Sequence, residues 1–249
     1  MAKTLRRKRN GECIYCGTPG KVTDEHVFPE AWYPEDTPLE LWKWQVPACS
    51  ACNARYGEKE SRILPFLAMS VEPWQLGAKG IADKAWKAMN ARYARDEDDA
   101  GKRAHVLELM RRRLDSAPLS KVIDALPLGW PPEVRDYTTT HVRFSDTWPV
   151  FGKIIRGLTY IISNGKRIDE NYVVRIFREL SIVPAVFRLT PATMYSCGPG
   201  IVVQMINIDP FPMSFSEVVI WQTHRYFAVV MPRPMEEELE GQGDDQTAG

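Results

Sequence analysis

Four of the five cysteines in this 249-residue chain fall into two Cys-x-x-Cys pairs, and these pairs constrain how the N-terminal part can fold. The first pair is Cys13 and Cys16, and the second is Cys49 and Cys52. Such an arrangement suits Zn²⁺, which takes four sulfur ligands tetrahedrally at about 2.3 Å. A site closed by four thiolates has no open position for a substrate. We therefore expect a structural zinc that stabilises a unit with too small a core to fold alone.

The fifth cysteine, Cys197, lies in a Ser-Cys-Gly-Pro-Gly run, and we expect a small buried residue there rather than a nucleophile. The N-terminus lacks the apolar stretch of a signal peptide, and no run approaches the roughly 20 apolar residues that span a membrane. The sequence therefore predicts a cytoplasmic protein without a membrane segment. A reducing compartment favours metal binding over disulfides for paired cysteines.

The charges of the chain balance, with 32 lysines and arginines against 32 aspartates and glutamates, so net charge neither indicates nor excludes a nucleic-acid partner. Their distribution is uneven. Residues 1–12 form a basic arm that we expect to be flexible, and residues 233–249 form an acidic tail that we expect to be disordered. The arm can follow a phosphate backbone or be a solvated terminus.

Groups suited to catalysis lie between and just after the cysteine pairs. Glu25 and His26 open the run Glu-His-Val-Phe-Pro, and Asn53 directly follows the last cysteine of the second pair. Carboxylate and amide oxygens are hard ligands of the kind that Mg²⁺ or Mn²⁺ prefers. An imidazole titrates near neutral pH and can take a proton from water. A base and a cation are what phosphodiester hydrolysis requires.

In this order and spacing, the two cysteine pairs, the Glu25-His26-Val27-Phe28-Pro29 run and Asn53 resemble the HNH endonucleases of the ββα-metal class, in their zinc-stabilised form. The resemblance implies a hairpin followed by a helix, with one divalent ion between them. It implies that His26 is the general base and that Glu25 and Asn53 bind the catalytic ion.

The chain departs from this family at one position. The family's central asparagine, which braces the histidine loop, would fall at Trp44, with Gln45 next to it. We expect Gln45 or the backbone to supply the bracing. Of Trp32, Trp42 and Trp44, we expect at least two to form core rather than to stack on bases.

Several other charged residues and histidines are weaker candidates. Glu58 and Glu60 follow Asn53 on a predicted helix, and we expect both to be solvated acids. Basic residues of the same helix are better placed to meet a nucleic-acid backbone than the Arg111–Arg113 triplet. These helical residues are Arg55, Lys59 and Arg62. The remaining histidines are predicted to be surface or structural residues: His105, His141 and His224.

The sequence pattern predicts an α+β fold in several parts. Residues 13–70 form the zinc-held ββα-metal module, with a helix from Asn53 that stops before Pro65. Residues 71–132 form a helical segment and linker, with helices around 81–89 and 106–114.

Residues 133–232 are predicted to form an α+β domain of unknown role. An apolar stripe over 150–162 predicts a helix with Lys153 and Arg156 opposite the stripe and a left-handed cap at Asn164-Gly165. A second helix is predicted over 173–180. Short antiparallel strands are then predicted at 186–189, 201–208, 218–222 and 226–231.

These features predict a metal-dependent endonuclease acting on DNA, with RNA as an alternative substrate. A different class of function is a zinc-finger binding or interaction protein whose nuclease site is degenerate. The C-terminal half also resembles the tails of uncharacterised prokaryotic HNH proteins, which implies a role in defence or in mobile elements. Target specificity and oligomeric state lie beyond the sequence.

Overall fold

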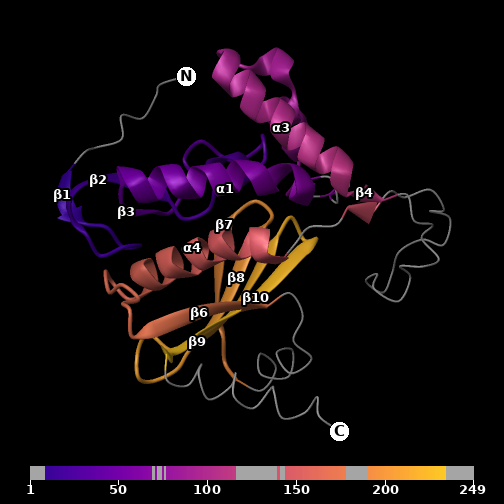
Figure 1. The fold of residues 1–249 in the computed structure, drawn as a ribbon. Helices are drawn as coiled ribbons and strands as arrows, with labels where there is room; N and C mark the ends of the chain where they lie inside the picture. The colour runs from indigo at the N-terminus through magenta and orange to yellow at the C-terminus, as the bar shows by residue number, and fades with distance from the viewer. Residues whose placement is uncertain are drawn as a thin grey trace, which may run out of the picture.

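The computed structural model describes residues 9–68, 71, 75, 77–115, 139–140, 144–177 and 190–233. Within these ranges the chain forms four α-helices, a three-stranded sheet, a five-stranded sheet and a two-stranded ladder, and every strand pairing is antiparallel (Figure 1). The predicted α+β class is therefore confirmed. None of the helices in the described ranges is both long enough and apolar enough to cross a membrane.

The N-terminal part is a small sheet covered by one helix. Strands β1 (Arg9–Glu12), β2 (Pro19–His26) and β3 (Gln45–Cys49) lie in the order β1-β2-β3, and α1 (Ser50–Ala68) begins directly after β3. A short 3-10 helix, η1 (Glu30–Trp32), lies in the connection between β2 and β3. The predicted hairpin followed by a helix is therefore present.

Helix α1 continues through Pro65, so the prediction that it ends before this proline is wrong. Proline removes one backbone N–H, which leaves the carbonyl of Ser61 without its usual intrahelical partner. The residues around it are an apolar run that is buried from Ile63 to Ala68. Burial of this run offsets the lost hydrogen bond.

The middle of the chain is helical, as predicted. Helices α2 (Ile81–Met89) and α3 (Glu97–Arg113) flank a 3-10 turn, η2 (Ala91–Tyr93). A small core of Phe66, Met89 and Met110 joins both helices to α1. Beyond α3, a two-stranded ladder pairs β4 (Leu114–Asp115) with β5 (Thr139–Thr140), and the predicted linker at 127–132 lies outside the described residues.

Helix α4 (Phe144–Ile162) contains the predicted apolar stripe but begins before it and includes Pro149. Asn164 and Gly165 both have positive φ, and the N–H of Gly165 donates to the carbonyl of Tyr160 at 2.8 Å, which is the predicted left-handed cap. The expectation for Lys153 is wrong. Its side chain is fully buried instead of lying on a solvated face.

The C-terminal sheet has the strand order β6-β10-β9-β8-β7. Its members are β6 (Tyr172–Phe177), β7 (Thr193–Gly198), β8 (Ile201–Asn207), β9 (Ser214–Ile220) and β10 (His224–Pro232). The last three strands were predicted, with slightly different ends, and β7 was not. The predicted strand at 186–189 lies outside the described residues.

The helix predicted over 173–180 is wrong where the structure describes it. Residues Tyr172–Phe177 form β6, which pairs with β10 and buries Val174 and Ile176 on alternate positions. A short apolar run fits the two-residue period of a strand as well as the 3.6-residue period of a helix. Backbone hydrogen bonding to the edge of β10 favours the strand here.

One continuous core joins the N-terminal part to the C-terminal sheet. Helix α4 lies between α1 and the sheet (Figure 1), and Trp32 packs against Phe151 of α4 with ring centroids 5.8 Å apart. The indole N–H of Trp221, in the turn after β9, donates to the carbonyl of Trp32 at 2.8 Å. The zinc-type module therefore folds against the rest of the chain.

Candidate metal centre and the adjoining ion network

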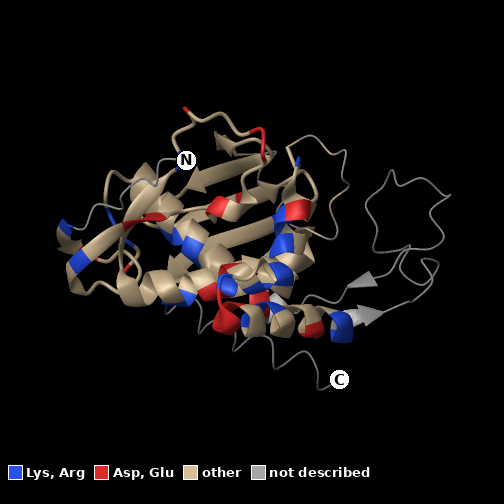
Figure 2. Cartoon of the chain, turned by 90° about the horizontal axis from the view of Figure 1, so that it is seen from above, with Lys and Arg blue, Asp and Glu red and all other residues tan. Residues whose placement is uncertain are grey.

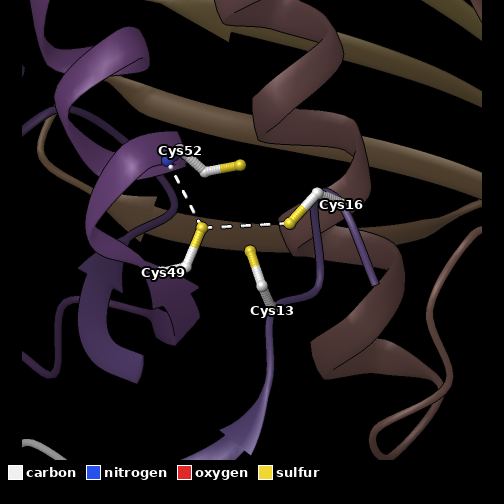
Figure 3. Close-up of side chains that lie close together, drawn as sticks. All are labelled: Cys13, Cys16, Cys49 and Cys52. Atoms are coloured by element: carbon white, nitrogen blue, oxygen red, sulfur yellow. Dashed lines mark hydrogen bonds between the residues drawn. The ribbon is translucent and has the colours of Figure 1, made fainter. Parts of the chain in front are cut away.

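The four paired cysteines converge on one point. The sulfur atoms of Cys13, Cys16, Cys49 and Cys52 all lie within 4.8 Å of one another (Figure 3). The Sγ atoms of Cys16 and Cys49 are 3.8 Å apart, which matches the roughly 3.8 Å between sulfurs in a tetrahedron with bonds of about 2.3 Å. The cluster can therefore hold a zinc ion, as predicted from the spacing.

Two tight backbone arrangements present these sulfurs. The turn after β1 carries Cys13 and Cys16, and it is closed by the N–H of Gly17, which donates to the carbonyl of Cys13 at 2.8 Å. Gly17 has a φ of 71°, a conformation that favours glycine. Cys49 ends β3 and Cys52 lies in the first turn of α1, where its backbone N–H points to the Cys49 sulfur at 3.5 Å (Figure 3).

The thiols of the cluster differ in acidity because their surroundings differ. Hydrogen bonding to the side chain and backbone of Thr18 lowers the pKa of the exposed Cys16 thiol to about 6. Burial raises the pKa of Cys13 and of Cys52. The buried thiols therefore need the charge of a bound metal ion to ionise at neutral pH.

A second convergence of side chains lies at the end of β2. The Nζ atom of Lys153 is 2.9 Å from Oε1 of Glu25, 2.5 Å from Oε1 of Glu60 and 2.6 Å from the carbonyl oxygen of His26. Glu25 is 4% exposed, and the lysine side chain is fully buried. One ammonium group therefore joins β2, α1 and α4.

Two members of this network were not predicted. Glu60 was expected to be a solvated acid, which is wrong because its side chain is only 14% exposed and is paired with Lys153. One sequence feature indicates that the α4 face carrying Lys153 is buried. This feature is Gly157, four residues after Lys153. A Cβ atom at Gly157 would lie 2.9 Å from Val27, so a glycine there permits α4 to pack closely on the chain after β2.

His26 is braced in the two ways that the sequence left open. Gln45 lies opposite His26 in the β2–β3 pairing, and its side-chain Nε2 is 2.9 Å from Nε2 of the imidazole. The N–H of Val27 donates to the carbonyl of Trp44 at 2.9 Å. Gln45 therefore orients the ring, and the backbone at Trp44 fixes the start of the loop.

Asn53 contacts β2 at Thr23, two residues before Glu25. Its Nδ2 donates to the hydroxyl of Thr23 at 3.4 Å. Thr23 and Glu25 are two residues apart on β2, so both side chains lie on the strand face that packs on α1. The amide of Asn53 therefore contacts Thr23, while the Glu25 carboxylate contacts Lys153.

The oxygen atoms around Lys153 are of a chemical type that can bind a divalent ion. Two carboxylates and a carbonyl converge on the ammonium, and hard oxygen donors of this kind are what Mg²⁺ and Mn²⁺ prefer. The donors fit such an ion by type. Within the described ranges, the four cysteines are the one group of three or more His, Cys, Asp or Glu side chains close enough to share a metal.

The basic residues of α1 are partly committed to local contacts. The guanidinium of Arg55 lies over the ring of Tyr56 at 4.9 Å and approaches the Cys52 sulfur at 3.8 Å. Arg62 pairs with Glu58, the predicted solvated acid, at 2.6 Å, and both are well exposed. Figure 2 shows basic and acidic segments interleaved along the helices.

Arg111 and Arg112 of the triplet are exposed, and Arg112 pairs with Glu108 at 2.9 Å. This contact agrees with the expected solvated face of α3.

Cys197 and the two remaining histidines that the structure describes, His105 and His224, have the structural roles predicted for them. Cys197 is buried, and burial raises the pKa of its thiol to about 12, which does not suit a nucleophile. His105 is exposed, and Nε2 of His224 donates to the carbonyl of Leu67 at 2.7 Å. His141 lies outside the described residues.

The tryptophans between the cysteine pairs also follow the prediction. Trp32 is fully buried, and Trp44 packs against the core and the ring of Tyr195, with centroids 5.8 Å apart. Trp42 is 80% exposed. Two of the three therefore belong to the core.

Comparison with known proteins gives no matching family model, no matching curated protein and no matching solved structure.

Proposed function

We propose that this chain is a metal-dependent endonuclease of the HNH kind that hydrolyses phosphodiester bonds in DNA. The observation that supports this most is the placement of His26 at the end of β2, oriented by Gln45, in an antiparallel hairpin that leads directly into α1. The cysteine cluster fixes the other end of the same hairpin.

In this proposal Nδ1 of His26 takes a proton from the attacking water, while Nε2 carries the ring proton and donates it to the side-chain amide oxygen of Gln45, in the other of the two orientations that this amide can adopt. Its imidazole is partly buried, and the amide of Gln45 limits its rotation, so its position relative to a bound phosphate is set before the substrate arrives. The hydrogen bond between Val27 and Trp44 holds the chain where it leaves β2.

Glu25 and Asn53 would hold the divalent ion, with its remaining positions open to water and phosphate oxygens. When bound, Mg²⁺ or Mn²⁺ offsets the negative charge that develops on the phosphate and on the leaving oxygen. Thr23 accepts a hydrogen bond from the Asn53 amide group and so orients its oxygen.

The burial of Glu25 favours a second candidate function. Its carboxylate is neutralised by Lys153, and a permanently closed pair would leave a zinc-held module that binds nucleic acid without cutting it. An RNA-directed nuclease would use the same groups as the DNA enzyme, so RNA belongs in the same substrate panel.

A plasmid assay separates these functions. Zinc-loaded full-length protein is incubated with supercoiled plasmid or with single-stranded RNA, in Mg²⁺ or Mn²⁺. The variants are His26→Ala and, as a matched control on the exposed face of α3, His105→Ala. Nicking by the wild type and His105→Ala but not by His26→Ala supports the endonuclease. Intact plasmid that is retained by the protein in a gel supports the binding module.

A further inference from the structure

Lys153 provides a fixed positive charge where the proposed ion would meet Glu25. Three oxygens lie within 2.9 Å of its Nζ atom, and two of them belong to carboxylates of different elements. An ammonium surrounded by oxygens in this way has the surroundings that a hard metal ion requires. The lysine therefore occupies an oxygen of Glu25 that a divalent ion would need.

Two carboxylates approach the ammonium of Lys153. Glu25 and Glu60 are two carboxylates that share one ammonium. The hydroxyl of Tyr15 is buried and has no hydrogen-bond partner among the described residues. Its pKa is raised well above the usual range, mainly by burial and to a smaller extent by the negative charge of Glu25. The surroundings therefore favour a cation over a neutral group.

The lysine comes from a distant part of the chain. It is 128 residues from Glu25 in sequence and reaches it because α4 packs closely on Val27 at Gly157. The C-terminal half thus delivers a charge to a carboxylate of the N-terminal module.

We propose that Lys153 competes with a divalent ion for the Glu25 carboxylate, so that α4 controls access of the ion to the site. This proposal takes the position of the ion from the proposed function, but it does not depend on hydrolysis. An ammonium beside a divalent cation repels it, and without the ammonium two carboxylates remain whose charge an ion can neutralise.

Mn²⁺ binding to the zinc-saturated full-length protein tests the competition. Free Mn²⁺ is followed by electron paramagnetic resonance for the wild type, Lys153→Met and the charge-keeping control Lys153→Arg. We expect Lys153→Met to bind one Mn²⁺ at least about tenfold more tightly than the wild type. Lys153→Arg should show no gain, and Glu25→Gln in the Lys153→Met background should remove it. Equal or weaker binding by Lys153→Met overturns the proposal.

A second measurement guards against a folding defect in Lys153→Met. Thermal unfolding is recorded with and without Mn²⁺, and the melting temperature of Lys153→Met should rise more with Mn²⁺ than that of the wild type. If that variant does not fold even with Mn²⁺, Lys153→Met/Glu60→Gln removes one charge of each sign and is tested for the same Mn²⁺ gain; no gain there also overturns the proposal. Tighter Mn²⁺ binding without plasmid nicking would support the competition and contradict the nuclease.

Discussion

The cysteine cluster and the Lys153 network are both points where side chains from several elements converge, but they differ in where the cation comes from. The cluster gathers soft sulfurs from residues 13–52 and needs an external ion to balance its thiolates. The network gathers hard oxygens and carries its own cation on α4. The first therefore couples folding to metal supply, and the second couples the N-terminal module to the C-terminal half.

The largest effect should follow removal of the metal from the cluster. We expect about one zinc per chain by elemental analysis and loss of the β1–β3 sheet and α1 when a chelator strips it, because structural zinc contributes on the order of 10 kcal/mol to folding in small zinc modules. Cys49→Ser should have the same effect in circular dichroism. Cys197→Ala keeps all four ligands and should retain its zinc; a folded protein without zinc would contradict the comparison.

Loss of the internal cation should be the next largest effect. Lys153→Met removes the ammonium that the Glu25 and Glu60 carboxylates share and should reduce the free energy of unfolding by about 3–5 kcal/mol, measured by urea denaturation without divalent ions. Lys21→Met, on the exposed part of β2, is the control and should unfold like the wild type. If both variants unfold alike, the network does not join the two halves.

The close packing of α4 should have a smaller effect. In Gly157→Ala the new Cβ atom meets Val27 at 2.9 Å, so we expect a loss of about 1–3 kcal/mol in the same denaturation experiment. Gly152→Ala on the same helix meets nothing within 4 Å and should stabilise the protein by about 0.5–1 kcal/mol. Equal effects at the two glycines would show that α4 does not approach Val27 as described.

The smallest effect should come from a partly exposed ion pair on α3, in contrast with the fully buried Lys153. Asp99 pairs with Arg103 on α3 at 3.0 Å, and this contact with the guanidinium lowers the pKa of the carboxyl from 3.8 to about 2. A lowered pKa adds stability above pH 3.8 that is lost as the pH falls through about 2. Asp99→Asn should lose this small contribution at pH 7 as it does at pH 4, and the difference from the wild type should disappear as the pH falls through about 2. Unaltered acid unfolding would remove this role for Asp99.

The cysteine cluster could be predicted from the sequence because its ligands are held by local geometry. A turn fixes one pair, and the strand-to-helix junction fixes the other. The apolar periods of α2, α3 and α4 and the C-terminal cap of α4 are likewise local, so these patterns identified the helices. Gln45 as the brace of His26 followed from its place next to Trp44.

The Lys153 network could not be predicted from local patterns, because it depends on which face of α4 meets β2. A charged residue beside an apolar stripe is usually solvated, and long-range packing reverses this for Lys153 and Glu60. Packing against distant parts of the chain also outweighed the local sequence pattern at two other places. It placed Tyr172–Phe177 in a sheet and extended α1 past Pro65.

The initial rate of plasmid nicking in Mn²⁺ is the most direct test of the proposed endonuclease, with His26→Ala compared against wild type and His105→Ala. Loss of a general base should lower the rate at least about 100-fold, while the His105→Ala rate stays at that of the wild type. A His26→Ala protein that folds, holds its zinc and nicks plasmid at the wild-type rate would contradict the role of His26 and with it the nuclease.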